Sequence, residues 1–351
     1  MNQAQFTYVA MPARVVFGAG AVQKLAAEVA ALGVKRALVI STPGRAQMMR
    51  EVAKGLDIAG VFDQAVMHTP LALVEAARRQ AAEVEADCCV VVGGGSTIGF
   101  GKAIAATAGL PIVAVPTTYS GSEMTMLWGV SDGGLKKTGR AASVLPKTVI
   151  YDPLLTLDLS PATSAASGMN ALAHAAEALY AQDTNPVVAL IAEEAIRALS
   201  ISLPVIRQTP RDLEARTSAL YGAWLCGMVL NSAGVALHHK LCHVLGGSFN
   251  LPHAETHSIV LPHAMRYNQD AAREAMSRVE RALGTQAAAA GIFDLEKRLG
   301  LPMRLSDLGF KEKDLERAAR IATETPYPNP RKVEYAPVLE LLRNAYQGQR
   351  P

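Results

Sequence analysis

Long apolar runs are missing from this 351-residue sequence. No stretch reaches membrane-spanning length without a glycine, a histidine or a charged residue. The first residues also lack the basic segment and apolar core of a secretory signal. We therefore expect a cytoplasmic protein that contacts no membrane.

Charge of one sign is not concentrated anywhere in the chain. The 34 basic and 31 acidic residues are scattered, for a formal net charge of +3. Because no block of like charge could follow a phosphate backbone, nucleic-acid binding is not expected. Half of the residues are hydrophobic and 19% are charged, which is typical of a globular enzyme and not of a disordered chain.

Paired cysteine motifs are absent too. The four cysteines form neither a CxxC pair nor the spacing of a zinc ribbon, so we interpret them as free thiols that pack in the core. They are Cys88, Cys89, Cys226 and Cys242.

The two halves of the chain differ in their pattern of hydrophobic residues. Up to about residue 155, short β-branched runs such as 37–40, 89–92, 112–115 and 148–151 alternate with helical segments. This pattern predicts an α/β dinucleotide-binding domain over 1–155, with a Rossmann-like parallel sheet.

Beyond Pro153 the sequence is rich in alanine and leucine at helical spacing, which predicts an all-helical substrate domain over 156–351. Prolines are expected to break its helices, at Pro161, Pro204, Pro210, Pro252 and Pro302. In open α/β proteins the ligand lies beyond the carboxyl ends of the strands, so chemistry is expected between the two halves.

A glycine-rich turn follows the apolar run 90–92. Gly93, Gly94, Gly95 and Ser96 come directly after it, and a helix is expected to begin at Gly101. Glycines let the backbone approach an anion closely, and the amides of a helix start favour negative charge. We interpret the turn as the pyrophosphate site of a nicotinamide cofactor; a purely structural tight turn is the alternative.

Two further loops are predicted to contact the cofactor. The run 112–115 leads into hydroxyl-bearing residues, of which Thr117, Thr118 and Ser122 are suited to phosphate or ribose oxygens. The alternative is an ordinary Ser/Thr loop with a helix cap at Ser122. After the first run come Ser41 and Pro43, with no acidic residue nearby to repel a 2′-phosphate, which predicts use of NADH or NADPH.

Polar residues recur at helical spacing in the second half. Asn170 and His174 are four residues apart, as are His239 and His243, and His253 follows. One buried histidine is often only a satisfied core residue, but several are costly to bury without a partner or a ligand. We expect these five residues to meet in one catalytic pocket.

Together these segments resemble the iron-containing alcohol dehydrogenase superfamily over nearly the whole chain. The resemblance implies its dehydroquinate synthase-like fold and a homodimer. In metal-dependent members, an Asp and a His four residues apart join two later histidines to hold a divalent metal. The corresponding positions here are Asn170, His174, His239 and His253. Because a neutral amide replaces the only anionic ligand, we expect a degenerate site and no metal.

Further segments are similar to one branch of the superfamily, the maleylacetate reductases. They are Gly99 in the glycine turn, 119–125 with 128–129, 68–70, 136–140 with 144–146, and 329–331. The resemblance implies NAD(P)H-dependent reduction of maleylacetate, a small dicarboxylate, to 3-oxoadipate in the degradation of aromatic compounds.

Residue roles are predicted from the clustered imidazoles and the dianionic substrate. His174, His239 and His253 would bind a carboxylate or the developing enolate, and His243 would position nicotinamide or donate a proton. Four basic residues are further candidates for anion contacts, with a solvated surface role as the alternative: Lys102, Lys137, Arg140 and Arg331.

Three rival functions stay open at this point. One is a metal-dependent alcohol or polyol dehydrogenase in which Asn170 is a neutral ligand. Another is a lyase similar to dehydroquinate synthase, and the third is a binding protein that has lost its chemistry.

Overall fold

A parallel six-stranded sheet organises residues 10–159 in the computed structural model, which describes residues 6–10, 13–67, 69–132 and 135–351. The strand order is β1-β8-β5-β4-β2-β3. The strands are β1 (Arg14–Phe17), β2 (Arg36–Ile40), β3 (Asp57–Phe62), β4 (Cys88–Gly93), β5 (Ile112–Pro116) and β8 (Thr148–Tyr151). The four predicted strands are confirmed as β2, β4, β5 and β8. His68, from a branch-specific segment, lies outside the described residues.

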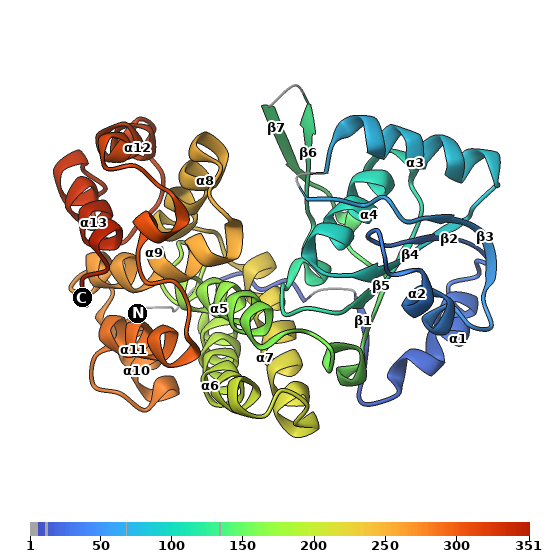
Figure 1. Cartoon of the computed structure of the whole chain (residues 1–351), viewed down its shortest axis with the longest axis horizontal. Helices are drawn as coiled ribbons and strands as arrows, with labels where there is room; N and C mark the ends of the chain where they lie inside the picture. The colour runs from blue at the N-terminus through green and yellow to red at the C-terminus, as the bar shows by residue number, and fades with distance from the viewer. Residues whose placement is uncertain (1–5, 11–12, 68, 133–134) are drawn as a thin grey trace. The chain divides into compact units, whose positions relative to one another are not determined.

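Helices cover both faces of this sheet (Figure 1). On one face α1 (Leu25–Ala31) and α2 (Ala46–Val52) share a core with β2, β4 and β5. On the other lie α3 (Leu71–Glu83) and α4 (Gly95–Ala108). All residues of β5 are buried, which is why these strands read as continuous apolar runs and not as alternating ones.

A small hairpin stands apart from the sheet and was not predicted. Its strands are β6 (Leu127–Asp132) and β7 (Leu135–Arg140), paired antiparallel. Single-turn 3-10 helices complete this unit: Ala21–Lys24, Ser122–Met124, Ala142–Val144 and Pro153–Thr156.

Helix α4 begins at Gly95, so the expected start at Gly101 was wrong. Glycines usually weaken a helix interior, and the run 95–101 therefore looked like a loop. A side chain at Gly101 would collide with the Cγ2 methyl of Val91 in β4, so the glycine lets the helix lie close to the sheet.

The second unit comprises 160–351 with residues 6–9, and it is helical: no strand follows β8 in the described chain. Its helices are α5 (Pro161–Ala178), α6 (Pro186–Gln208), α7 (Leu213–Ser232), α8 (Leu237–Phe249), α9 (His253–Asn268), α10 (Arg273–Leu283), α11 (Ala288–Leu299), α12 (Leu315–Thr323) and α13 (Tyr335–Gln347). The 3-10 helices Leu305–Leu308 and Glu312–Asp314 lie between α11 and α12.

Of the five prolines expected to break helices, four lie at or just beyond helix ends, but the break expected at Pro204 is wrong. Pro161 is the first residue of α5 and Pro252 caps α9, whereas α6 runs through Pro204. The helix continues only four residues past it, so the hydrogen bond that proline removes belongs to the last turns.

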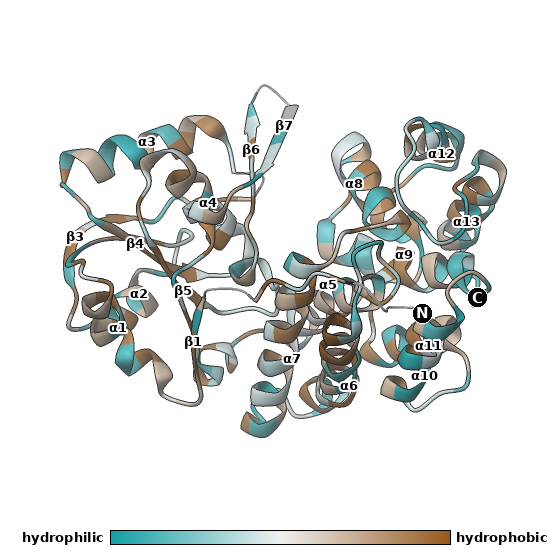
Figure 2. Cartoon of the chain, turned by 180° about the vertical axis from the view of Figure 1, so that it is seen from behind, coloured by the Kyte–Doolittle hydropathy of each residue, from teal (hydrophilic) through white to brown (hydrophobic). Residues whose placement is uncertain are grey.

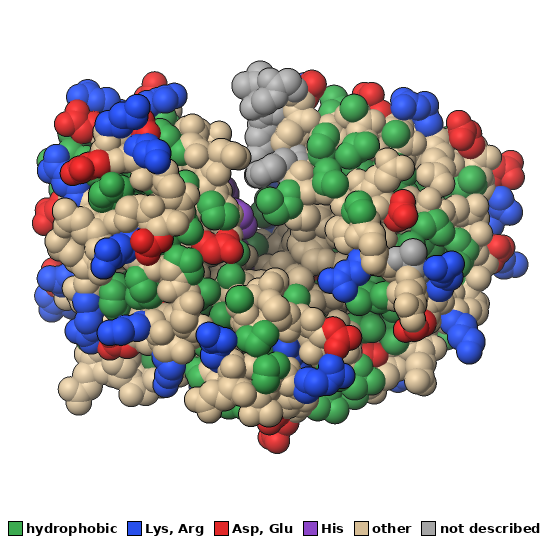
Figure 3. Space-filling view, in the orientation of Figure 1, with side chains coloured by type: hydrophobic (Ala, Val, Ile, Leu, Met, Phe, Trp, Pro, Cys, Tyr) green, Lys and Arg blue, Asp and Glu red, His purple; other side chains and the backbone are tan. Residues whose placement is uncertain are grey.

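Hydropathy and charge are distributed as expected for a buried core and a solvated surface. In Figure 2, the strands of the sheet and much of α6 are brown. Figure 3 shows basic and acidic side chains interspersed over the visible face. Among the described residues, no single helix is long and apolar enough to cross a membrane. Helices α7 and α8 together have the required length and composition, but the chain bends by 98° between them.

The glycines of α4 give a stability test. Gly101→Ala should destabilise the protein by about 1–3 kcal/mol, because the new methyl overlaps Val91. Gly99→Ala is the matched control, since nothing lies within 4 Å of a Cβ there, and it should be neutral or stabilising by up to about 1 kcal/mol. Urea denaturation followed by circular dichroism measures both, and equal midpoints would contradict the packing role of Gly101.

Candidate active site

The predicted phosphate turn joins β4 to α4. Gly93 has a φ of 156°, and a Cβ there would lie 2.5 Å from Oγ1 of Thr97. No described side chain caps α4, and Ser96 in its first turn is exposed. The first-turn amides of an uncapped helix are available to an anion, and the helix dipole favours it. The turn therefore has what a pyrophosphate requires.

The second predicted loop lies directly against this turn. The amide of Thr117 donates to the carbonyl of Gly93 at 3.0 Å. A Cβ on Gly94 would lie 3.0 Å from the side chain of Thr118, and one on Gly95 would lie 2.9 Å from Ser120. The structure thus brings both loops together at the carboxyl ends of β4 and β5, beside the point where the strand order reverses.

Lys102 is not a surface residue. Its side chain is buried, and Nζ donates to the Ser122 carbonyl at 2.8 Å and to the Thr125 hydroxyl at 2.9 Å. Burial lowers its pKa to about 7, opposed by the nearby Glu123. Lys102 therefore holds the end of the second loop in place.

Glu123 anchors the same loop from within. Its carboxylate accepts from the Tyr151 hydroxyl at 2.8 Å and from the Ser120 hydroxyl at 3.2 Å. Burial raises the pKa of this carboxyl, and the hydrogen bonds from its own backbone, Tyr151 and Ser120 oppose the shift. The sequence did not indicate this residue, because an acidic residue in a loop is normally expected to be exposed to solvent.

The remaining predicted cofactor contacts lie elsewhere on the α/β unit. Ser41 is buried just after β2, and Pro43 is exposed in the turn that follows. Lys137 lies on β7, where its ammonium pairs with Asp132 at 3.2 Å and both side chains are about half exposed. Contact of these residues with a cofactor stays a prediction.

In the helical unit, α5 carries three polar residues on one face. Asn170, His174 and Glu177 lie at helical spacing, and all three are almost fully buried, at 7%, 7% and 1% exposure. Nδ2 of Asn170 lies 3.4 Å from Nε2 of His174. Nothing in the described chain partners the Asn170 carbonyl oxygen.

Helices α8 and α9 bring five imidazoles to this face, those of His238, His239, His243, His253 and His257. His239 stacks on His174 with ring centroids 5.0 Å apart, and it lies 6.2 Å from His243. His257 lies 4.3 Å from His253 and 5.0 Å from His239, centroid to centroid. His243 and His253 are exposed, whereas His239 and His257 are buried. The predicted histidines thus form one cluster that runs from the surface into the core.

A hydrogen-bonded chain links Glu177, His239, His174 and Asn170. Nδ1 of His239 bonds to Oε2 of Glu177, and Nε2 of His239 lies 2.9 Å from Nδ1 of His174. The second oxygen of Glu177 accepts from the backbone amide of His238 at 2.8 Å. Both ring nitrogens of His239 are therefore engaged by protein groups.

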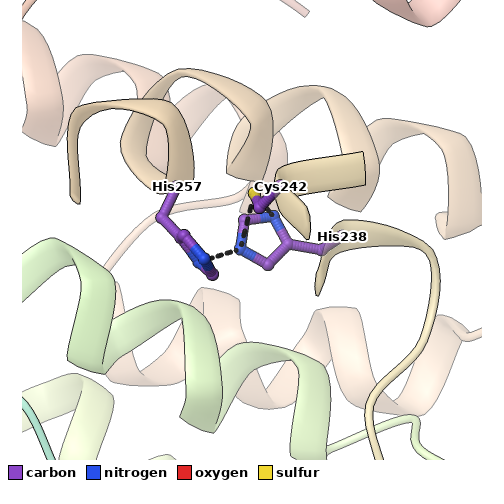
Figure 4. Close-up of side chains that lie close together, drawn as sticks. All are labelled: His238, Cys242 and His257. Atoms are coloured by element: carbon purple, nitrogen blue, oxygen red, sulfur yellow. Dashed lines mark hydrogen bonds between the residues drawn. The ribbon is translucent and has the colours of Figure 1, made fainter. Parts of the chain in front are cut away.

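His238, Cys242 and His257 form a second buried group, shown in Figure 4. Nε2 of His238 lies 3.0 Å from Nδ1 of His257 and 3.8 Å from the sulfur of Cys242. Burial lowers the pKa of both imidazoles well below the usual value, and it raises the pKa of the thiol. The three side chains are neutral as packed, although their spacing is that of metal ligands.

The predicted metal positions do not fit iron as they are arranged. Asn170, His174, His239 and His253 include no carboxylate, and Glu177 already accepts two hydrogen bonds. The two nitrogens of His174 face Asn170 and His239, so its lone pair points at another side chain. A divalent cation here would lack both charge compensation and a free imidazole from α5.

Sequence reasoning missed several members of the cluster although their spacing was visible. Glu177 is three residues after His174, and His257 is four residues after His253. Asn329, in a branch-specific segment, lies beside the cluster: its Oδ1 accepts from the Leu237 amide at the start of α8, at 3.4 Å.

The chain matches two family models over most of its length. Residues 12–153 match the iron-containing alcohol dehydrogenase model, and residues 164–346 match the C-terminal model of the same family. The chain is 54% identical to a maleylacetate reductase from Burkholderia cepacia over 348 residues, 99% of each protein.

Solved structures agree with these matches. A crystal structure of maleylacetate reductase from Agrobacterium tumefaciens is 48% identical, covers 99% of this chain and 100% of its own, and superposes with a TM-score of 0.97. That from Rhizobium sp. is 46% identical, with a TM-score of 0.96 and the same coverage.

Restoring the missing anion should restore metal affinity. We expect Asn170→Asp to tighten Co²⁺ or Zn²⁺ binding at least about tenfold, about 1.4 kcal/mol, because a carboxylate beside His174 compensates the cation. Isothermal titration calorimetry measures the affinity. Cys242→Ser in both backgrounds is the control, since it removes the thiol of the second group. Equal affinity in the wild-type protein and the Asn170→Asp variant would contradict this account of the site.

Proposed function

The chain belongs to the iron-containing alcohol dehydrogenase family, and within it we propose that this protein reduces maleylacetate to 3-oxoadipate with NADH or NADPH. The observation that carries the proposal is the 54% identity to a maleylacetate reductase over 99% of both chains. The cluster supports it, because a neutral amide stands at Asn170 among imidazoles. A homodimer is part of the same proposal.

NAD(P)H supplies the hydride for this reaction. The residues proposed to hold its pyrophosphate are Gly93, Gly94, Gly95 and Ser96, because the helix start behind them is uncapped. Thr117, Thr118 and Ser122 would bind neighbouring oxygens from the second loop. Ser41 and Pro43 would flank the adenosine end, and Lys137 would contact a phosphate from β7.

The substrate has an alkene conjugated to a ketone, which sets the demands on the site. Hydride adds to the alkene carbon farther from the ketone, the π electrons move onto the ketone oxygen, and the resulting enolate takes a proton on the neighbouring carbon. An enolate is a much weaker base than the alkoxide of an alcohol dehydrogenase. Hydrogen-bond donors can therefore stabilise it where an alkoxide would need a Lewis acid.

We assign contact with the dicarboxylate and the enolate to the cluster. His253 and His243 are the exposed imidazoles and would meet the substrate directly, with His243 positioning nicotinamide or donating the proton. Both nitrogens of His239 are engaged, so it would act through His174. Asn170 and His174 would complete the pocket without a metal, since their donor set does not fit one.

A single assay tests the function. With maleylacetate, the wild-type protein should oxidise NADH stoichiometrically. Dialysis against a strong chelator should leave the rate unchanged, because hydrogen bonds from the imidazoles stabilise the enolate. Absorbance of NADH measures both. A rate lost on chelation and restored by Fe²⁺ or Zn²⁺ would favour a metal-dependent dehydrogenase, and no consumption of NADH would exclude reductase activity.

Cofactor preference follows from the turn after β2. With no acid in residues 41–45 to repel a 2′-phosphate, kcat/KM for NADH and NADPH should differ by less than about a hundredfold, about 2.7 kcal/mol. Initial rates at saturating maleylacetate, with each cofactor varied, give the ratio. A larger preference for NADH would show that another group excludes the phosphate.

A further inference from the structure

We propose that Glu177 is a positioning residue: it sets the direction of the hydrogen-bonded chain through His239 and His174 to Asn170. For its effect on turnover, the inference rests on the proposed reductase function. The hydrogen bonds themselves can be tested without any substrate.

The direction is set at the carboxylate, which meets two donors with two oxygens. Oε1 accepts from the backbone amide of His238, a group that can only donate. Oε2 meets Nδ1 of His239, and since a carboxylate oxygen can only accept, the shared hydrogen belongs to the nitrogen. The start of α8 favours a negative charge at this point. His239 is therefore held with its hydrogen on Nδ1.

The remaining links follow from this one tautomer of a neutral imidazole. With its single hydrogen on Nδ1, His239 accepts at Nε2, so Nδ1 of His174 carries the hydrogen across the 2.9 Å contact; a doubly protonated His239 would donate there instead. Nε2 of His174 is then an acceptor, and Asn170 must turn its amide nitrogen toward it. This orientation accounts for the unpartnered carbonyl oxygen of Asn170, which is left to accept from a ligand N–H or O–H.

A glutamine at this position should reverse the chain. The backbone amide of His238 can only donate, so the single side-chain oxygen of the glutamine must face it. Its NH₂ group then faces Nδ1 of His239, and the imidazole can be satisfied only by moving its hydrogen to Nε2. The hydrogen of His174 would move to Nε2 in turn, and the amide of Asn170 would flip.

The test compares Glu177→Gln with the wild-type protein by ¹⁵N NMR of histidine-labelled samples, assigned through single-histidine replacements. We expect the Nδ1–H tautomer for His239 and His174 in the wild type and the Nε2–H tautomer in the variant. Glu296→Gln is the matched control, because Glu296 is another buried glutamate of the helical unit, on α11, and burial alone raises its pKa. It should leave both tautomers unchanged.

Turnover gives a second readout. The kcat of Glu177→Gln with maleylacetate should fall at least about tenfold, since the flipped Asn170 amide would present a donor to the ligand where the wild type presents its carbonyl oxygen. Glu296→Gln should stay within about twofold of the wild type.

Two results would overturn the inference: a wild-type His239 with its hydrogen on Nε2, or unchanged tautomers in a folded Glu177→Gln protein. Where the glutamine variant does not fold, the wild-type spectrum decides alone. Absence of maleylacetate turnover in the wild type would count against the proposed function and leave the tautomer result standing.

Discussion

Burial of a single carboxylate under the first turn of α8 is the constraint on which the helical site depends. A buried charge is costly unless it is paired or hydrogen-bonded, and Glu177 satisfies both of its oxygens on that turn. The same contact caps a helix end and orients an imidazole. Any movement of α8 relative to α5 would therefore disturb helix capping and the histidine cluster together.

Much of the fold followed from local sequence, and the site only in part. Strands β2, β4, β5 and β8 were evident because buried parallel strands need continuous β-branched runs. That His174 and His239 lie in one cluster was expected from the spacing of polar residues along two helices, but their direct contact was not. Glu177 and His257 had the same spacing signal, but a lone acid in an alanine-rich helix reads as solvent-facing until the helix that covers it is known.

Lys102 shows where local information ends. A lysine in the first turn of a predicted helix is normally exposed, and its sequence neighbours give no other indication. It is buried because the carbonyl of Ser122 and the hydroxyl of Thr125, twenty or more residues later, lie within reach of its ammonium. Only the close approach of the second loop to α4 creates those acceptors.

The glycines of the phosphate turn need a more careful interpretation than close approach to an anion. A Cβ at Gly93 would lie 2.5 Å from Thr97 in α4, and one at Gly94 or Gly95 would lie 3.0 Å from Thr118 or 2.9 Å from Ser120 of the second loop, so local packing also disfavours side chains here. Packing therefore accounts for part of the preference for glycine here, independently of phosphate. The start of α4 is also uncapped, as are those of α3 and α9, so its first-turn amides need an acceptor from elsewhere. A phosphate supplies that acceptor together with the charge the helix dipole favours.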